Sequence, residues 1–123
     1  MTTKDFNVYN MPGILAREVQ RQDPADASKW IRDEQWYSST RETFYNLFRF
    51  FQERQLVVRQ LVESPDDVDK VVLKFSELTP RGQAFVKSRA DERWLMSFDR
   101  PGSKKVPSDW TYLDKQLQKI QAE

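Results

Sequence analysis

Polar side chains on one face of a helix predicted over residues 40–54 have the chemistry to contact nucleic-acid bases. Arginine can donate two hydrogen bonds to guanine, and asparagine can bind adenine in the same two-point manner. Glu42 and Glu53 lie on the same side, and the whole face equally fits the solvated surface of an amphipathic helix. The residues able to reach bases or phosphates are Thr40, Arg41, Tyr45, Asn46 and Arg49.

Histidine and cysteine, the residue types behind much enzyme chemistry, are absent from the 123 residues. Their absence excludes serine–histidine and cysteine–histidine catalysis, histidine-ligated zinc and disulfide bonds. The chain has 19 Asp and Glu residues, but neither a glycine loop for a phosphate nor a paired-carboxylate motif at an interpretable spacing. We therefore expect that the protein is not an enzyme and holds no cofactor.

Three neighbouring aspartates, Asp66, Asp67 and Asp69, suggest a cation site at first sight. A calcium loop would also need a glycine for its sharp turn and a glutamate further along, and this stretch has neither. The sequence therefore favours a solvated turn and predicts no metal site.

Charge is nearly balanced overall but unevenly distributed along the chain. Twenty Lys and Arg residues against 19 Asp and Glu give a net charge of +1, which is low for a nucleic-acid-binding domain. Residues 81–105 contain seven basic and three acidic side chains, whereas residues 23–34 are acidic on balance. This asymmetry permits a basic face that could hold phosphates.

Length and composition indicate one domain spanning residues 1–123. Four Trp, four Tyr and eight Phe residues can supply much of its core. No run approaches the roughly 18 apolar residues of a membrane-spanning helix, and the polar residues 1–10 are not a signal peptide. Because the chain also lacks cysteine, we expect a soluble cytoplasmic protein that does not enter membranes.

The best-defined element is a helix over residues 40–54. Apolar residues recur at the i, i+3, i+4 and i+7 positions, which is the spacing of one buried helical face. A capping box of Ser39 and Glu42 marks the start of this helix. The apolar residues are Phe44, Leu47, Phe48 and Phe51.

Several aromatic side chains could line a ligand pocket. Aromatic residues at helical spacing more often belong to a packed core, however, so a core is the favoured interpretation. The residues concerned are Phe44, Phe48, Phe51, Phe75, Phe85 and Trp94.

Two apolar runs, residues 56–63 and 68–75, predict an antiparallel β-hairpin with its turn at residues 64–67. Thr79–Pro80 predicts the start of a further helix that runs to about residue 97, since threonine is a good N-cap and proline suits the first helical position. Side chains on the hairpin could hold phosphates, with ordinary outward-facing charge as the alternative. These side chains are Arg59, Lys70 and Lys74.

The remaining segments predict an extended arm over residues 1–10 and three further helices. The first helix spans residues 12–22, the second starts at Asp23–Pro24, and the last covers residues 106–123. Apolar residues in the last helix step by 3, 4 and 3, and this stripe could form a dimer seam or fold back on its own domain; we favour the dimer. The stripe consists of Trp110, Leu113, Leu117 and Ile120.

Residues 38–87 resemble the winged helix-turn-helix of bacterial regulators such as the MarR and PadR groups. The likeness rests on the helix and its exit over residues 44–57, and on residues 78–82, which match the family pattern Leu-Thr-x-x-Gly. Gln55 stands where the family usually has glycine. The resemblance implies an α+β, mainly helical winged-helix fold, with residues 56–75 as a two-stranded wing and an extra C-terminal helix.

The same resemblance implies a sequence-specific transcriptional regulator that binds double-stranded DNA as a homodimer. Residues 40–54 would be its recognition helix, and the wing or the basic region 81–105 would contact phosphates. The alternative is a protein-interaction module on the same scaffold, such as an immunity, antitoxin or phage-type inhibitor protein, whose partner is another protein. The near-zero net charge and the acidic turn fit that alternative. A replication or partition accessory protein is the third possibility.

Overall fold

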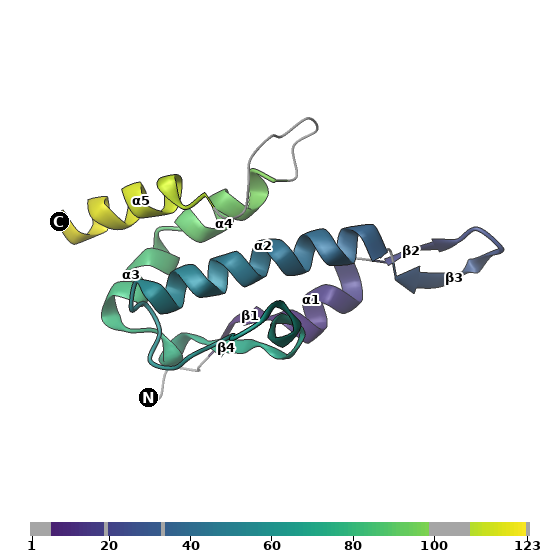
Figure 1. The fold of residues 1–123 in the computed structure, drawn as a ribbon, viewed down its shortest axis with the longest axis horizontal. Coiled ribbons are helices and arrows are strands. Elements are labelled where there is room, and N and C mark those ends of the chain that lie inside the picture. Colours follow the sequence, from purple (N-terminus) through teal and green to yellow (C-terminus); the bar gives the residue numbers. More distant parts are fainter. Residues whose placement is uncertain (1–5, 19, 33, 99–108, 123) are drawn as a thin grey trace.

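The structure of the chain is a computed structural model that describes residues 6–18, 20–32, 34–98 and 109–122. It is α+β and mainly helical, as the sequence predicts, with a long helix between a small sheet on one side and further helices on the other (Figure 1). None of the described helices is long and apolar enough to cross a lipid bilayer. In chain order the elements are β1 (Asn7–Asn10), α1 (Met11–Glu18), β2 (Gln20–Asp23), β3 (Asp26–Arg32), α2 (Glu34–Glu53), the 3₁₀ helix η1 (Pro65–Lys70), β4 (Val72–Lys74), the 3₁₀ helix η2 (Phe75–Glu77), α3 (Pro80–Lys87), α4 (Ala90–Met96) and α5 (Thr111–Ala122).

The helix α2 forms the centre of the molecule because it has apolar side chains on two sides. Its predicted buried face is confirmed and consists of Phe44, Leu47, Phe48 and Phe51. On this side Tyr9 of β1 lies edge-on to Phe44 and Phe48, with ring centroids 5.6 and 5.7 Å apart. Phe50 faces the layer of helices on the other side and packs against Phe85 of α3, with ring centroids 5.7 Å apart. Burying a side chain of this size contributes about 1.5–3 kcal/mol, so α2 holds the two layers together.

The helix α2 begins at Glu34, earlier than the sequence predicts. Tyr37 is buried and extends the apolar face by two turns, which accounts for the earlier start. Ser39 therefore lies inside the helix, and the predicted capping box with Glu42 is wrong.

The C-terminal end of α2 closes at Gln55, whose φ of 58° is in the left-handed region. The Leu56 amide donates to the Phe51 carbonyl at 2.9 Å, and the Gln55 amide donates to the Gln52 carbonyl at 3.2 Å. These two bonds form a Schellman motif. Gln55 thus adopts the backbone conformation that glycine, the usual residue of the resembled family here, adopts at least cost.

The predicted β-hairpin of residues 56–63 and 68–75 is wrong, because the two segments do not pair with each other in the described part of the chain. β4 pairs instead with β1 in an antiparallel ladder. Val57 forms an isolated bridge with Leu78, and the residues before β4 form the 3₁₀ helix η1. The two-stranded wing of the resembled fold is therefore not formed by residues 56–75.

A side chain of α2 explains why residues 56–63 do not become a strand of that hairpin. Gln52 Oε1 accepts hydrogen bonds from the amides of Leu61 and Val62, both at 2.5 Å. In a hairpin, amides of this segment would donate to the neighbouring strand. Because Gln52 already satisfies two of them, the segment stays against α2 as an irregular loop.

The predicted N-terminal arm is extended over its described part, where β1 pairs with β4. Phe6, just before β1, stacks on Phe75 with ring centroids 4.9 Å apart. Residues 1–5 of the predicted arm lie outside the described residues.

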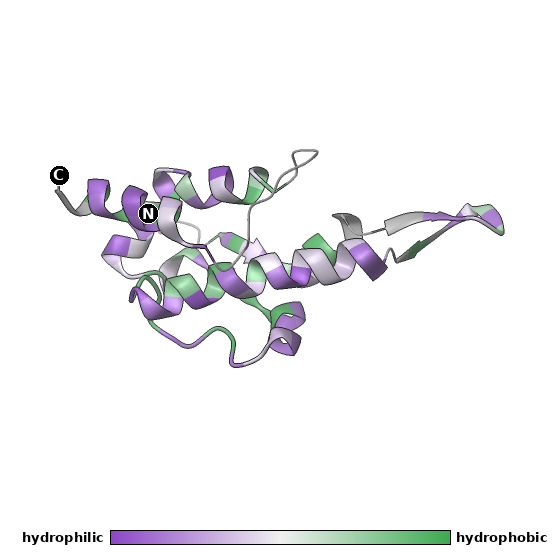
Figure 2. Cartoon of the chain, turned by 45° about the horizontal axis from the view of Figure 1, so that its top comes forward, coloured by the Kyte–Doolittle hydropathy of each residue, from purple (hydrophilic) through white to green (hydrophobic). Residues whose placement is uncertain are grey.

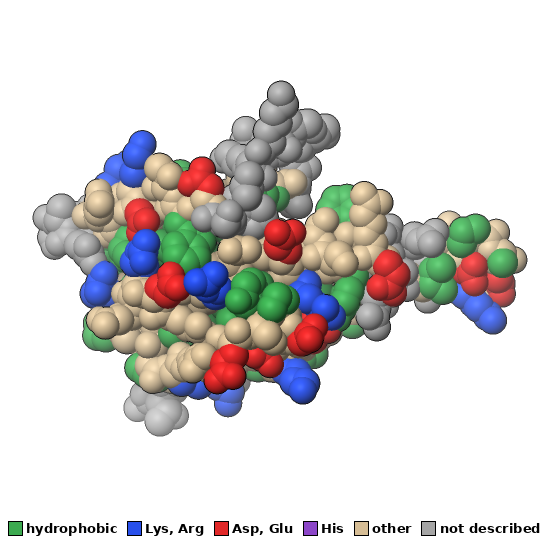
Figure 3. Space-filling model, viewed as in Figure 1, with side chains coloured by type: hydrophobic (Ala, Val, Ile, Leu, Met, Phe, Trp, Pro, Cys, Tyr) green, Lys and Arg blue, Asp and Glu red, His purple; other side chains and the backbone are tan. Residues whose placement is uncertain are grey.

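The helix predicted over residues 12–22 is confirmed in its first part as α1, which ends at Glu18. Residues 20–32 form a β-hairpin, so the last residues of that predicted helix and the helix predicted from Asp23–Pro24 are wrong. Asp23 Oδ1 accepts a hydrogen bond from the Ala25 amide at 2.9 Å, so this Asp–Pro pair makes a turn. The hairpin is a sheet of its own and projects past the N-terminal end of α2 (Figures 1 and 2). Figure 3 shows acidic, basic and apolar side chains together at its tip, where the exposed residues include Pro24, Ala25, Asp26, Ala27 and Lys29.

The start of α3 is as predicted, but the helix is shorter. Thr79 Oγ1 accepts a hydrogen bond from the Gly82 amide at 3.2 Å, and Pro80 occupies the first turn. The helix predicted to reach residue 97 divides into α3 and α4, because Arg89 takes a left-handed φ of 63°. Gly82 packs so closely against the end of α2 that a Cβ atom would lie 2.0 Å from the Leu56 carbonyl oxygen.

The C-terminal helix α5 lies within the predicted segment 106–123 and packs on α3 and α4. Asp109 Oδ1 accepts a hydrogen bond from the Thr111 amide at 3.0 Å and so satisfies an amide of the first turn that has no partner within the helix. Residues 106–108 and 123 of the predicted segment lie outside the described residues.

Candidate functional site

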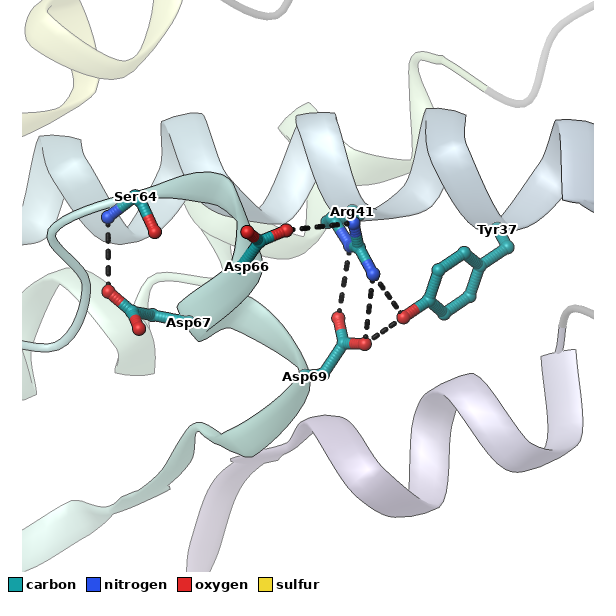
Figure 4. A network of polar contacts seen from close by, with 6 residues as sticks. All are labelled: Tyr37, Arg41, Ser64, Asp66, Asp67 and Asp69. Carbon is teal, nitrogen blue, oxygen red and sulfur yellow. Dashed lines mark hydrogen bonds and ion pairs between the residues drawn. The ribbon is translucent and has the colours of Figure 1, made fainter.

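Arg41, predicted to contact DNA, binds the 3₁₀ helix η1 of its own chain (Figure 4). Its Nε donates to Asp69 Oδ1 at 3.1 Å, and its Nη1 donates to Asp66 Oδ1 at 3.3 Å. Tyr37, one turn earlier on α2, donates its hydroxyl hydrogen to Asp69 and accepts a hydrogen bond from Arg41. The network fastens η1 to α2, and the guanidinium of Arg41 has its hydrogen-bond partners within its own chain.

Asp67, the third residue of η1, bonds back to the backbone at the start of this helix, whose N-cap is Ser64. Its Oδ2 accepts hydrogen bonds from the amides of Glu63 at 2.8 Å and Ser64 at 3.0 Å, the second of which is drawn in Figure 4. These two backbone hydrogen bonds lower the pKa of Asp67. The neighbouring aspartates face Arg41, and among the described residues no group of three or more His, Cys, Asp or Glu side chains is placed to hold a metal ion.

Among the other predicted base-contacting residues of α2, Tyr45, Asn46 and Arg49 also make contacts within the chain. Asn46 is buried, and its Nδ2 donates to the backbone carbonyl one turn earlier at 2.9 Å. Arg49 pairs with Glu53 at 2.8 Å, and its guanidinium lies over the ring of Tyr45 at 5.8 Å from the centroid. Thr40 is half-buried and lines the cleft described below.

The predicted phosphate contacts of residues 56–75 come from separate elements. Arg59 pairs with the carboxylate of Glu77 and donates to the Val72 carbonyl at 2.9 Å. The hydrogen bond from Arg59 lowers the pKa of Glu77. Lys70 of η1 and Lys74 of β4 are exposed to solvent. Arg59 therefore braces the loop before η1, while the lysines stay on the surface.

The apolar stripe predicted as a dimer seam packs inside the chain. Trp110, at the start of the stripe, lies edge-on to Phe50, with ring centroids 5.6 Å apart. Arg54 donates to both carboxylate oxygens of Asp114, at 2.8 and 3.1 Å, and so ties α5 to the end of α2. A dimer stays a prediction, without this stripe as its support. In the stripe, Leu113 and Leu117 are buried, and Trp110 and Ile120 are half-buried.

An apolar cleft of about 420 Å³ lies between the N-terminal half of α2 and helix α4. One wall consists of α2 side chains at the i, i+3, i+4, i+7 and i+8 positions, which is the spacing of a single helical face. The second wall comes from α4 and the residues that follow it, and the cleft is completed by β1 and α1. The α2 residues are Trp36, Ser39, Thr40, Thr43 and Phe44, the facing residues are Glu92, Leu95, Met96 and Phe98, and the others are Val8, Tyr9 and Ile14.

Two large apolar side chains of the cleft are exposed to solvent. Trp36 is 56% exposed and Met96 is 66% exposed, whereas Phe44 in the same cleft is buried. Large contiguous apolar surface on a soluble protein commonly marks an interaction site. The apolar surface of this region therefore extends from the hollow onto its rim.

A buried hydrogen bond joins two of the elements around the cleft. Tyr9 of β1 donates its hydroxyl hydrogen to Oδ2 of Asp91 in α4, next to the lining residue Glu92. Asp91 is 1% exposed, and burial raises its pKa against the lowering effect of the Tyr9 hydrogen bond. Burial also raises the pKa of Tyr9. Because the bond ties β1 to α4, it holds these two sides of the cleft at a fixed spacing.

Sequence reasoning identifies this site only in part. Of the aromatic residues considered for a ligand pocket, Phe44 lines the cleft and Phe75 is half-buried beside Phe6. Trp36 and Met96 were not among the predicted site residues; the spacing of Trp36 with the hydroxyl residues of α2 is the signal that could have indicated a second helical face. The aromatic residues that belong to the core are Phe48, Phe51, Phe85 and Trp94.

No known protein family, no curated protein and no solved structure matches the chain. The resemblance to winged helix-turn-helix regulators therefore stays a prediction.

Proposed function

We propose that the protein is an interaction module that binds another protein through the cleft between α2 and α4. The observation that carries this proposal is the pair of exposed apolar side chains, Trp36 and Met96, at a hollow of about 420 Å³. Tryptophan and methionine are enriched at protein interfaces, and binding energy concentrates where an apolar anchor fills such a hollow. A partner that fills the cleft would take both side chains out of water.

The shape of the cleft suits a protein partner better than a small ligand. A small-molecule site typically encloses about 70–90% of the surface of its ligand. Trp36 and Met96 are more than half exposed, so a molecule within the hollow alone would leave much of their apolar surface in water. A protein surface can cover the hollow and its rim together.

The β2–β3 hairpin offers a further contact surface at the same end of α2. Its two strands pair with each other and extend away from the body (Figures 1 and 2). A two-stranded hairpin by itself is only marginally stable in water. A partner that also covered this hairpin would stabilise it.

The test is a selection of random peptides displayed on phage against the immobilised full-length protein. We expect selected peptides to bind the Trp36→Ala and Met96→Ala variants at least about tenfold more weakly, because each change removes apolar contact worth about 1.5–3 kcal/mol when buried. Val58→Ala is the matched control, since Val58 is 67% exposed and does not line the cleft. Peptides whose affinity is unchanged by the two cleft substitutions, or no enriched peptide at all, would contradict the proposal.

Binding of duplex DNA, by a dimeric winged-helix regulator, is the second candidate function. Exposed basic side chains on α3, on α4 and at the junction between them favour it, and they belong to the predicted basic region. On the face shown in Figure 3, however, basic and acidic side chains are interspersed, and Arg41, Arg49 and Arg59 make ion pairs within the chain. A gel-shift assay with random duplex at two salt concentrations tests it, since phosphate binding weakens steeply with salt. The basic residues are Arg81, Lys87, Arg89 and Arg93.

A further inference from the structure

We infer that the segment of the partner that enters the cleft is an amphipathic helix carrying a basic residue opposite Glu92. The inference rests on the proposed protein-binding function and specifies the chemistry of the partner. It depends on two features of the cleft: the helical nature of both walls and the position of its charged side chain.

Both walls of the cleft are helices, which excludes pairing between a partner strand and these walls. The backbone N–H and C=O groups within α2 and α4 bond to one another along each helix and leave no edge for a strand. Recognition by these two walls therefore uses side chains, as when an amphipathic helix lies in an apolar groove. An extended segment that lay between α2 and α4 would leave its own backbone groups without partners from these two helices.

The length of the α2 wall matches the apolar face of a short helix. Trp36 and Phe44 mark its ends, and eight residues at about 1.5 Å each separate them by about 12 Å. Anchors at positions i, i+3 or i+4, and i+7 of a partner helix span about 10.5 Å. Three apolar side chains of a two-turn helix can therefore reach along the whole wall.

The charge of the cleft calls for a basic group on the partner. Glu92 is exposed and is the one charged side chain among the described residues that line the cleft. It forms no ion pair within the described parts of the chain. The adjacent Arg93 donates to the carbonyls of Ser88 and Arg89, at the opposite end of α4 from Met96. The facing wall contributes only the neutral hydroxyls Ser39, Thr40 and Thr43. A Lys or Arg on the partner is therefore the complementary charge.

Three synthetic peptides test the inference by fluorescence anisotropy with the full-length protein. The first is an amphipathic helix with Leu anchors and lysines flanking them, the second replaces those lysines by glutamates, and the third is the lysine peptide with a central proline that breaks the helix. We expect the lysine peptide to bind most tightly. The glutamate peptide should bind about tenfold more weakly at low salt, and the proline peptide should bind more weakly than the lysine peptide at low and at high salt.

Variants of Glu92 assign the charge effect to one side chain. Glu92→Gln should weaken binding of the lysine peptide about two- to fivefold, and Glu92→Lys should reverse the preference toward the glutamate peptide. Glu63→Gln is the matched control, because Glu63 is exposed and lies outside the cleft. These differences in peptide affinity between the Glu92 variants and the natural chain should become smaller when the salt concentration is raised.

The outcomes separate this inference from the function on which it rests. If Trp36→Ala weakens binding of the lysine peptide but the Glu92 variants do not, the charge assignment is overturned while the proposed function stands. If the proline peptide binds as tightly as its parent, or neither helical peptide binds, the helical occupant is overturned. If the peptides bind but Trp36→Ala leaves their affinity unchanged, the proposed function itself fails.

Discussion

Replacing Gly82 by alanine is expected to destabilise the protein strongly. Gly82 is buried where α3 meets the end of α2, and a Cβ atom there would lie 2.0 Å from the carbonyl oxygen of Leu56 and 2.9 Å from its carbonyl carbon. Both contacts are with backbone atoms, so no rotation of a side chain can relieve the overlap. The start of α3 must therefore move away from Leu56.

The cost of that movement follows from the contacts it disturbs. Leu56 O accepts the Thr79 amide at 2.9 Å, and Thr79 Oγ1 donates to the Gln55 carbonyl at 2.9 Å. Each hydrogen bond contributes about 0.5–1.5 kcal/mol, and overpacking a buried site costs about 1–3 kcal/mol. Alanine regains about 0.5–1 kcal/mol of helix propensity relative to glycine. We expect the free energy of unfolding to fall by about 3 kcal/mol on these terms.

Urea unfolding followed by circular dichroism measures this change. With a slope of about 1–3 kcal/mol per molar urea, the midpoint should fall by about 1–3 M. Gly13→Ala is the matched control, because its Cβ atom would lie 3.2 Å from the Nδ2 atom of the flexible Asn10 side chain. We expect Gly13→Ala to be as stable as the natural chain or slightly more stable. Equal midpoints for the two variants would refute the reasoning.

Three further substitutions test other parts of the structure. Gln55→Gly should raise the free energy of unfolding by about 0.5–1 kcal/mol in the same urea assay, because Gln55 has a φ of 58°; a loss would contradict the helix end described above. Burial raises the pKa of Asp91 in the folded state, so its stabilising contribution is full below the pKa of Asp in the unfolded chain and is lost as pH rises through the raised value. Asp91→Asn keeps an acceptor for Tyr9 and should remove this decline of the free energy of unfolding with pH, measured by urea unfolding at several pH values. A difference between variant and natural chain that is the same at every pH would contradict this expectation. Arg41→Ala should lower thermal stability by about 1–2 kcal/mol through loss of its bonds to η1, with no change in the affinity of the cleft for selected peptides; weaker peptide binding would show that Arg41 acts in recognition.

Elements with strong local signals could be predicted from the sequence. The apolar spacing from Phe44 to Phe51 identifies the buried face of α2, and Thr79–Pro80 identifies the start of α3. Both signals act within one or two helical turns, so the distant parts of the chain do not alter them. The glycine in the pattern Leu-Thr-x-x-Gly also has a structural reason, the close approach of Gly82 to Leu56.

Pairings between distant segments could not be predicted in the same way. The apolar pattern of residues 68–75 indicates a strand but does not specify its partner, which is β1 near the start of the sequence. Asp23–Pro24 suits a helix start and a turn equally well, and the turn is what forms. A single left-handed residue, Arg89, divides a helix whose apolar pattern continues through the break.

The candidate site was the hardest part to predict, because polar residues on a helix do not reveal whether they face solvent or their own chain. Arg41 has the chemistry of a base contact, yet its partner Asp69 lies 28 residues further along the chain. The cleft combines residues of four elements, and its exposed Trp36 and Met96 become recognisable only once α2 and α4 lie side by side.

Mapping a phage-selected peptide onto the protein by NMR tests the central proposal most directly. On titration of the peptide into ¹⁵N-labelled protein, the largest amide shift changes should fall in residues 36–44 and 92–98 and should be lost in the Trp36→Ala variant. Shift changes centred instead on the exposed basic residues of α3, or spread evenly over the surface, would contradict binding of a partner between α2 and α4.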